Sequence, residues 1–161
     1  MEQRTFGSLG TISALTLGGG GIGQVWGATS REEAVATVLE AVDSGITFLD
    51  VAPSYGKGEA ESVIGEAFGG RLPHGVRVST KYGLGNPAAD QIIPLLERSL
   101  DESLARTKLD KVDLFLLHGQ IIPDDMANEY SGTPRSLFLQ AVCPAFEQLV
   151  TRGRIGAWGI S

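Results

Sequence analysis

Short, almost continuous apolar segments alternate along this chain with longer segments that have the apolar spacing of amphipathic helices. The apolar segments have the length of β-strands, and a strand followed by a helix occurs four times before a last strand. Parallel strands covered by helices are buried on both faces and therefore read as continuous apolar runs. The alternation predicts an α/β fold with five parallel strands and four helices.

The boundaries of these elements follow from local signals. Strands are expected in ALTLGGGGIG (14–23), ITFLDV (46–51), VRVSTK (76–81), VDLFLL (112–117) and IGAWGI (155–160). Helices are expected after the Ser30–Glu33 capping box, in GEAESVIGEAFGG (58–70), over 92–107 and over 136–152, where Pro144 bends or splits the helix. RTFGSLGTISAL (4–15) predicts a hairpin with its turn at 7–10, and residues 119–135 contain no clear element. No linker divides residues 1–161, so we expect one domain.

Charge and cysteine content exclude several classes of protein. The net charge is −6, with 13 basic against 19 acidic residues and no basic stripe, so we expect no nucleic-acid partner. A single cysteine, Cys143, allows no internal disulfide and fits a reducing compartment. The start MEQRTFGSLG lacks the apolar segment of a signal peptide, and no apolar run approaches the ~20 residues that span a bilayer. We therefore expect a cytoplasmic protein with no membrane contact, and the sequence predicts no metal site.

A Rossmann-type dinucleotide-binding domain is one candidate among parallel folds. Residues 18–23 satisfy G-x-G-x-x-G after a strand, and Asp50 ends the second strand, where such domains keep an acid for the ribose. A run of four glycines, however, meets this pattern almost automatically. The next helix is also expected near Ser30, so no helix N-terminus would meet a pyrophosphate at the glycines. This fold remains the lesser alternative.

A βα-barrel accounts for more of the sequence. Four polar residues lie at, or just past, the carboxyl ends of three successive strands: Asp50, Tyr55, Lys81 and His118. In a barrel these strand ends converge on one mouth, where such proteins build their sites. In an open sheet the same residues would form a row. Each residue alone has an ordinary structural explanation, so it is the set that favours the barrel.

Four blocks of sequence together resemble the aldo-keto reductase family. They are GITFLDVAPSYGKGEAESVIGEAF (45–68), VRVSTKYG (76–83), KVDLFLLHGQ (111–120) and LVTRGRIGAWGIS (149–161), and the resemblance covers essentially the whole chain. It implies a (β/α)8 TIM barrel closed at the bottom by an N-terminal hairpin. It also implies reduction of an aldehyde or ketone to an alcohol, or the reverse reaction, with NADPH or, less often, NADH.

The resemblance assigns a catalytic tetrad to Asp50, Tyr55, Lys81 and His118. Carbonyl reduction needs a proton for the developing oxyanion, and Tyr55 would give it as a general acid. The ammonium of Lys81 favours the phenolate that remains. Asp50 would pair with Lys81 and offset the cost of burying it. His118 would donate a hydrogen bond to the carbonyl oxygen.

The same resemblance implies contacts to the cofactor and to the substrate. Cofactor contacts are expected at Gly19, Gly20, Asp50 and Ser161. Substrate contacts are expected at Trp26, Tyr82 and His118. The glycine run would let the backbone approach a flat nicotinamide ring closely, and Trp26 would form an apolar wall for a small carbonyl substrate.

The family's barrel has three more strands than this chain supplies, and loops after those later strands hold the cofactor's phosphates. We expect one of three explanations: the chain is a fragment of a longer protein, it needs a C-terminal half or a second copy to close the barrel, or it is an inert or interaction half-barrel without catalysis. On its own, the 161-residue chain is expected to bind NADPH weakly or not at all and to be inactive.

Overall fold

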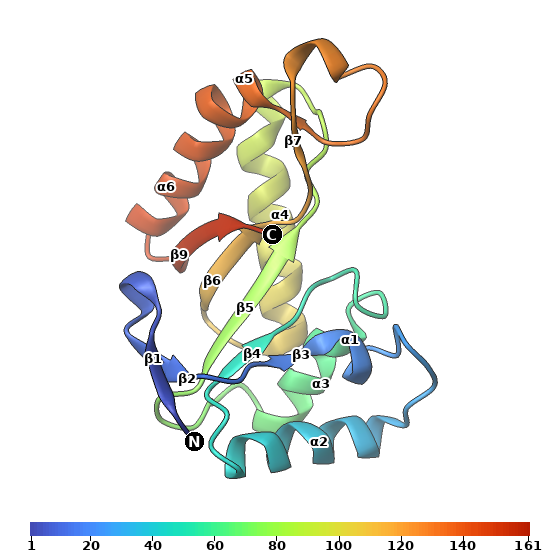
Figure 1. Cartoon of the computed structure of the whole chain (residues 1–161), viewed down its shortest axis with the longest axis vertical. Coiled ribbons are helices and arrows are strands. Elements are labelled where there is room, and N and C mark those ends of the chain that lie inside the picture. Colours follow the sequence, from blue (N-terminus) through green and yellow to red (C-terminus); the bar gives the residue numbers. More distant parts are fainter.

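One parallel sheet forms the centre of the computed structural model, which describes residues 1–161. Its strands, in spatial order, are β3 (Leu17–Gly18), β4 (Phe48–Asp50), β5 (Arg77–Tyr82), β6 (Val112–Leu117) and β9 (Ile155–Ile160). Each neighbouring pair is parallel, and the spatial order is the order along the chain (Figure 1). The five predicted parallel strands are confirmed.

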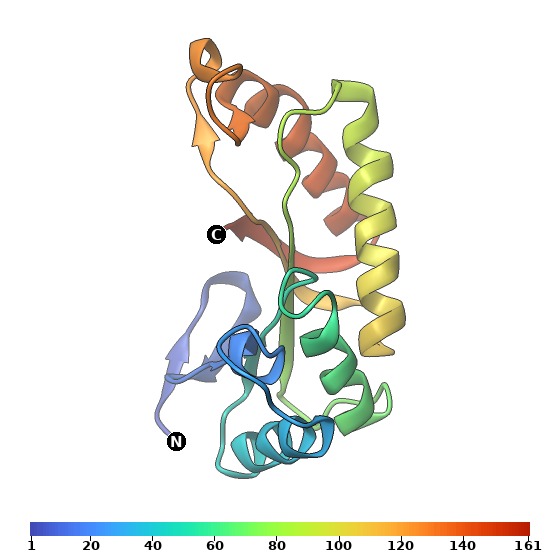
Figure 2. The ribbon, with the colours of Figure 1, turned by 90° about the vertical axis from the view of Figure 1, so that its right-hand side faces the viewer.

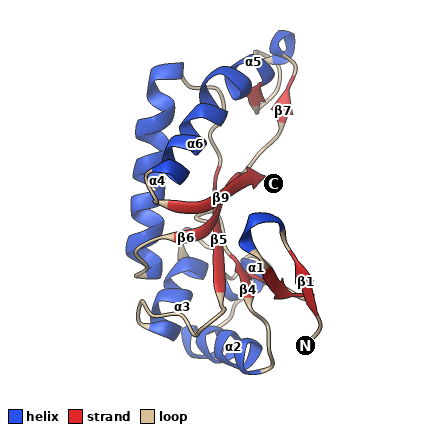
Figure 3. Cartoon of the chain, turned by 90° about the vertical axis from the view of Figure 1, so that its left-hand side faces the viewer, coloured by secondary structure: helices blue, strands red, loops and turns tan.

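The main helices all cover one face of this sheet. They are α2 (Arg31–Asp43), α3 (Glu59–Phe68), α4 (Ile92–Thr107) and α6 (Cys143–Thr151). The hairpin of β1 (Gln3–Thr5) and β2 (Thr11–Ser13) lies on the opposite side (Figures 2 and 3). A dinucleotide-binding fold has helices on both faces and a strand order that reverses. Because neither feature is present, that alternative is wrong, and the chain is an incomplete (β/α)8 barrel with helices outside.

The glycine run differs from its predicted conformation. Immediately after β3 the backbone makes one helical turn, α1 (Gly19–Ile22), before the chain reaches α2. A helical turn therefore begins at the glycines, contrary to expectation, because a run of glycines gives no propensity signal for a short turn of this kind. The predicted capping box of α2 is confirmed, since Ser30 and Glu33 each accept a hydrogen bond from the other's backbone N–H.

The last helix is split near Pro144, as predicted. A short helix, α5 (Arg135–Leu137), leads into a wide π-helical turn over Phe138–Val142, and α6 follows. Pro144 has no N–H to bond to the carbonyl four residues earlier, so the regular ladder cannot continue through it. At the end of the wide turn, the N–H of Cys143 bonds to the carbonyl of Phe138, five residues back.

The loop between β6 and α5 is more ordered than the sequence indicated. It contains β7 (Ile121–Ile122) and β8 (Thr133–Pro134), which pair in parallel as a small sheet. The hydroxyl of Thr133 also donates to the carbonyl of Gly85 over 2.9 Å, which attaches this loop to the segment after β5. Strands of two residues show no periodicity, so the prediction that residues 119–135 contain no element was wrong.

A separate apolar cluster lies on part of the inner face of the sheet. Leu9 and Ile12 of the hairpin pack there with Phe48 and Leu114, at the start of β4 and within β6. The hairpin therefore covers the bottom of the inner face and leaves the carboxyl ends of the strands open.

No helix in the structure is long and apolar enough to cross a membrane.

Candidate active site

Four polar side chains predicted from the sequence lie at the carboxyl ends of neighbouring strands. Asp50 is the last residue of β4, Lys81 is near the end of β5, and His118 directly follows β6. Tyr55 lies in the loop between β4 and α3, where its N–H donates to the carbonyl of Ala52 over 3.0 Å. Parallel pairing aligns the three strand ends, and the loop returns Tyr55 to them.

Lys81 is the buried centre of this group. Its side chain is 2% exposed, and Nζ donates to Oδ1 of Asp50 over 2.7 Å and to the carbonyl oxygen of Val51 over 2.9 Å. An ammonium removed from water is very costly unless an opposite charge and hydrogen-bond acceptors surround it. Asp50, whose side chain is 30% exposed, supplies that charge. The pair therefore fixes a positive charge in a largely dry position.

Tyr55 and His118 complete the group on the other side of Lys81. Nζ of Lys81 lies 4.8 Å from the centroid of the Tyr55 ring, within the range of a cation–π contact. The Tyr55 and His118 rings are 6.2 Å apart between centroids and meet edge to face at 84°. The structure thus brings a phenol, an ammonium, a carboxylate and an imidazole into one cluster.

The environment of His118 favours its neutral form. Burial lowers the pKa of His118 below its ordinary value, the charge of Lys81 lowers it further, and the carboxylate of Asp50 opposes both effects. A neutral imidazole has one N–H donor and one acceptor nitrogen. His118 can therefore donate one hydrogen bond from its ring without carrying charge.

Ser79, completely buried on β5, also belongs to this group and was not predicted from the sequence. Its hydroxyl donates to Oδ1 of Asp50 over 2.5 Å, the same oxygen that Lys81 binds. Strand side chains alternate between faces, so Ser79 and Lys81 point to the same side. The spacing of two residues between Ser79 and Lys81 on a predicted strand could therefore have identified Ser79 as a member of the cluster.

The glycines expected to contact a cofactor are packed against other parts of the chain. A Cβ on Gly20 would lie 2.7 Å from a ring atom of Trp26, whose side chain is otherwise 79% exposed. A Cβ on Gly19 would lie 3.0 Å from the carbonyl oxygen of Asp50 and 3.1 Å from a ring carbon of Tyr55. The absence of side chains here gives room to Trp26 at Gly20 and to Tyr55 at Gly19.

Tyr82 lies on the opposite face of β5 from Lys81. It packs against the cluster of apolar residues beneath the helices, which includes Leu84 and Leu96. Tyr82 also borders a small hollow that Lys81 and His118 share. The structure therefore places Tyr82 at the edge of the group, not at its centre.

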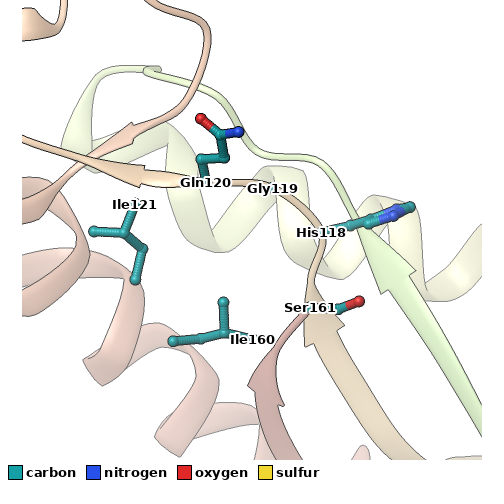
Figure 4. A pocket seen from close by; sticks show the side chains of 6 residues that line it. All are labelled: His118, Gly119, Gln120, Ile121, Ile160 and Ser161. Atoms are coloured by element: carbon teal, nitrogen blue, oxygen red, sulfur yellow. The ribbon is translucent and has the colours of Figure 1, made fainter.

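A cavity of about 560 Å³ opens next to His118 and Ser161 (Figure 4). The side chains of Ile121 and Ile160 face one another across it, while the ring of His118 points to the other side of its backbone. Hydrogen bonds from Ser161 N to Leu117 O and from Gly119 N to Ser161 O hold this corner together. Ser161 is thus fixed beside His118 at the top of the sheet.

Comparisons with known proteins agree with this architecture. The sequence model described as "Aldo/keto reductase family" matches residues 14–161. L-galactose dehydrogenase of Arabidopsis thaliana is 36% identical over 121 residues, which is 73% of this chain and 38% of that protein. Methylglyoxal reductase YeaE of Escherichia coli (strain K12) is 30% identical over 161 residues, which is 100% of this chain and 50% of that protein.

A solved structure extends the likeness to three dimensions. The aldo-keto reductase from Klebsiella pneumoniae, crystallised in complex with NADPH, superposes with a TM-score of 0.74 at 29% sequence identity, covering 99% of this chain and 50% of that one. The chain therefore spans about half the length, or less, of these relatives. Because the family match extends over residues 14–161, the chain belongs to the aldo-keto reductase family.

Proposed function

We propose that this chain carries the catalytic residues of an oxidoreductase that reduces an aldehyde or ketone to an alcohol with NADPH, and that it also supports the reverse reaction. The observation that carries the proposal is the position of Lys81. Its ammonium binds Asp50 at 2.7 Å and lies 4.8 Å from the centre of the Tyr55 ring, with His118 next to that ring. NADH is the alternative cofactor.

In this proposal Tyr55 gives and takes the proton. During reduction its phenol protonates the oxygen of the carbonyl as negative charge develops there, and during oxidation the phenolate accepts the proton back. The loss of this proton leaves negative charge on the phenol oxygen. The buried ammonium of Lys81 stabilises that charge, because a neighbouring opposite charge in a dry site favours the ionised form.

Asp50 and His118 have supporting roles. Asp50 neutralises and orients Lys81, and Ser79 in turn orients Asp50 through its hydrogen bond. His118, kept neutral by its surroundings, donates a hydrogen bond to the substrate oxygen. Such a donor directs the carbonyl oxygen toward Tyr55 and stabilises it as it becomes negative.

The residues around His118 suit a nicotinamide ring. The hydroxyl of Ser161 lies on the same side of its backbone as the His118 ring, where it can bind the carboxamide of the nicotinamide (Figure 4). When bound, the reduced nicotinamide supplies the hydride. Gly19, Gly20 and Asp50 would border the ring on the other side. Trp26 would form the substrate wall, with Tyr82 at its edge.

The phosphates of the cofactor and the closure of the barrel require more than the five strands described. β3 and β9 are the edge strands of the sheet, and each has one unpaired side. We propose that residues 1–161 fold as one domain and that further strands, from the same polypeptide or from a second copy, pair with these edges. An inert or interaction half-barrel is the alternative, and an NADPH fluorescence titration of the protein as its reading frame encodes it separates the two.

Replacement of Tyr55 with phenylalanine tests the function. Loss of a general acid is expected to lower kcat for NADPH-dependent reduction of small aldehydes and ketones by about 10²- to 10⁴-fold. Tyr130→Phe, at an exposed position in the 119–135 loop, is the matched control and should leave turnover unchanged. Near-normal turnover by the Tyr55→Phe protein would remove the basis of the proposal.

A further inference from the structure

Glu61 is a completely buried carboxylate outside the cluster of Asp50, Tyr55, Lys81 and His118. Its Oε1 accepts a hydrogen bond from the hydroxyl of Thr80 over 2.5 Å, and its Oε2 accepts from Nε of Arg106 over 2.6 Å. These three residues belong to α3, β5 and α4. The carboxylate therefore joins three elements behind the face of the sheet that carries Lys81.

Thr80 and Glu61 each lie next to one of the two groups that must stay close together in the proposed reaction. Thr80 lies next to Lys81, and Glu61 lies next to the loop of Tyr55. Thr80 immediately precedes Lys81 on β5, and their side chains point to opposite faces, Thr80 toward α3 and Lys81 toward the cluster. Glu61 lies in the first turn of α3, and that turn holds the Tyr55 loop: the N–H of Ala60 donates to the carbonyl of Tyr55 over 3.2 Å. Glu61 thus ties the segment that carries Tyr55 to the strand that carries Lys81.

Arg106 makes a second contact with the same loop. Gly58, between Tyr55 and α3, has φ of 88° and packs so closely on Arg106 that a Cβ there would lie 2.5 Å from Cδ of the arginine. Glu61 holds Arg106 in this position through a salt bridge of 2.6 Å. The stem of Arg106 therefore supports the loop from beneath while Glu61 attaches the start of α3.

Stabilisation of the fold does not by itself account for the buried ion pair of Glu61 and Arg106. Buried ion pairs are often no more stabilising than apolar side chains of similar size, and Nη2 of Arg106 is buried without a partner. Hydrogen bonds are directional, so they fix the relative positions of the elements that they join more strictly than apolar contacts do. We infer that Glu61, through Thr80 and Arg106, is a positioning residue that holds the Tyr55 loop against β5 so that the phenol stays at its distance from Lys81. This inference rests on the proposed function.

Thr80→Val is the test, because valine keeps the shape of threonine and removes only the donor to Glu61. In the protein as its reading frame encodes it, we expect kcat for carbonyl reduction to fall about 10- to 100-fold, as small misplacements of reacting groups do, with KM for the carbonyl and the affinity for NADPH unchanged. Thr80→Ser, which keeps the hydroxyl, should restore the kcat of the unaltered protein. Equal kcat values for the valine and serine variants overturn the inference.

A double variant separates positioning of Tyr55 from a general structural effect. In a Tyr55→Phe background, Thr80→Val should lower kcat no further, because the group that it misplaces is absent. A further loss of the same size overturns the inference. If Tyr55→Phe by itself leaves kcat unchanged, the proposed function has failed and the inference fails with it. A large Tyr55→Phe effect beside a normal Thr80→Val kcat overturns the inference alone.

Nuclear magnetic resonance gives a readout that does not depend on activity. With ¹³C in the tyrosine rings, the Tyr55 signal is the one that disappears in Tyr55→Phe. It is expected to move in Thr80→Val and to stay in place in Thr80→Ser, and an unmoved signal in a folded Thr80→Val protein contradicts the inference. If the valine variant does not fold, Glu61→Gln, which keeps the size of the side chain, is expected to give the same displacement, and an unmoved signal there also contradicts it.

Discussion

Lys81 and Asp50 form a hydrogen-bonded ion pair across neighbouring strands, with 2.7 Å between Nζ and Oδ1 and with very unequal burial of the two partners. The lysine side chain is 2% exposed and the aspartate side chain is 30% exposed. Water can therefore solvate the carboxylate in part, whereas the ammonium depends on protein acceptors. Removal of Asp50 therefore leaves a buried ammonium without its counter-charge, whereas removal of Lys81 leaves a carboxylate that water can still reach.

Asp50→Asn is expected to destabilise the fold more than Lys81→Met. The first leaves a buried ammonium without its counter-charge, which costs about 3 kcal/mol or more. The second leaves a carboxylate that keeps its Ser79 hydrogen bond and its access to water, and methionine fills the volume of the lysine stem, so the cost is no more than about 2 kcal/mol. Urea unfolding of both variants at neutral pH measures the difference. Equal losses, or a larger loss for Lys81→Met, would contradict this reading of the pair.

Ser79→Ala and Ser103→Ala are expected to have different effects, although both serines are completely buried. Ser79 donates to the charged Asp50, and loss of a hydrogen bond to a charged group costs about 1.5–3 kcal/mol. The hydroxyl of Ser103 has no partner, so its removal from α4 should be neutral or stabilising. Thermal or urea unfolding of the two variants provides the comparison. A Ser79→Ala protein as stable as Ser103→Ala would show that the Asp50 contact contributes nothing.

His118 should make the fold less stable in mild acid. Because the pKa of His118 is lowered in the folded protein, its contribution to stability is complete above the ordinary value of 6.5 and is lost as the pH falls below that value toward the lowered one. The unfolding free energy of the unaltered protein should therefore fall more between about pH 8 and about pH 5 than that of His118→Gln. His74→Gln, at an exposed loop position, is the control and should follow the unaltered protein. A His118→Gln protein with an unchanged pH dependence would rule out this role.

Gly65→Ala should destabilise the contact between α3 and α4. A Cβ at this position would lie 2.1 Å from the carbonyl oxygen of Arg106, so the helices must separate or the backbone must shift. Overpacking of this kind costs about 1–3 kcal/mol. Gly18→Ala, where a Cβ meets nothing within 4 Å, is the matched control. Similar unfolding midpoints for the two variants would mean that the helices adjust without cost.

The regular elements were predictable because their signals are local. The strand over 112–117 and the helix over 92–107 were placed at the residues that the structure shows, since continuous apolar runs and apolar spacing at three and four residues depend only on neighbouring sequence. The structure of residues 119–135 was not predictable. Its two short strands are stabilised by pairing with one another and by the bond of Thr133 to Gly85, and no local pattern encodes either contact.

For the candidate site, the sequence by itself determined the positions of Asp50, Lys81 and His118, because each lies at, or just past, the end of a segment with a strand pattern. Only the tertiary structure decided which polar groups share one acceptor or one face. Ser79 joined the group because the register of β4 and β5 puts it opposite Asp50. Glu61 was paired with Thr80 and Arg106 only when three elements packed together. Side-chain direction along a strand is a local property, whereas the partner that a side chain meets depends on strand register and helix packing, which arise from contacts between residues far apart in the sequence.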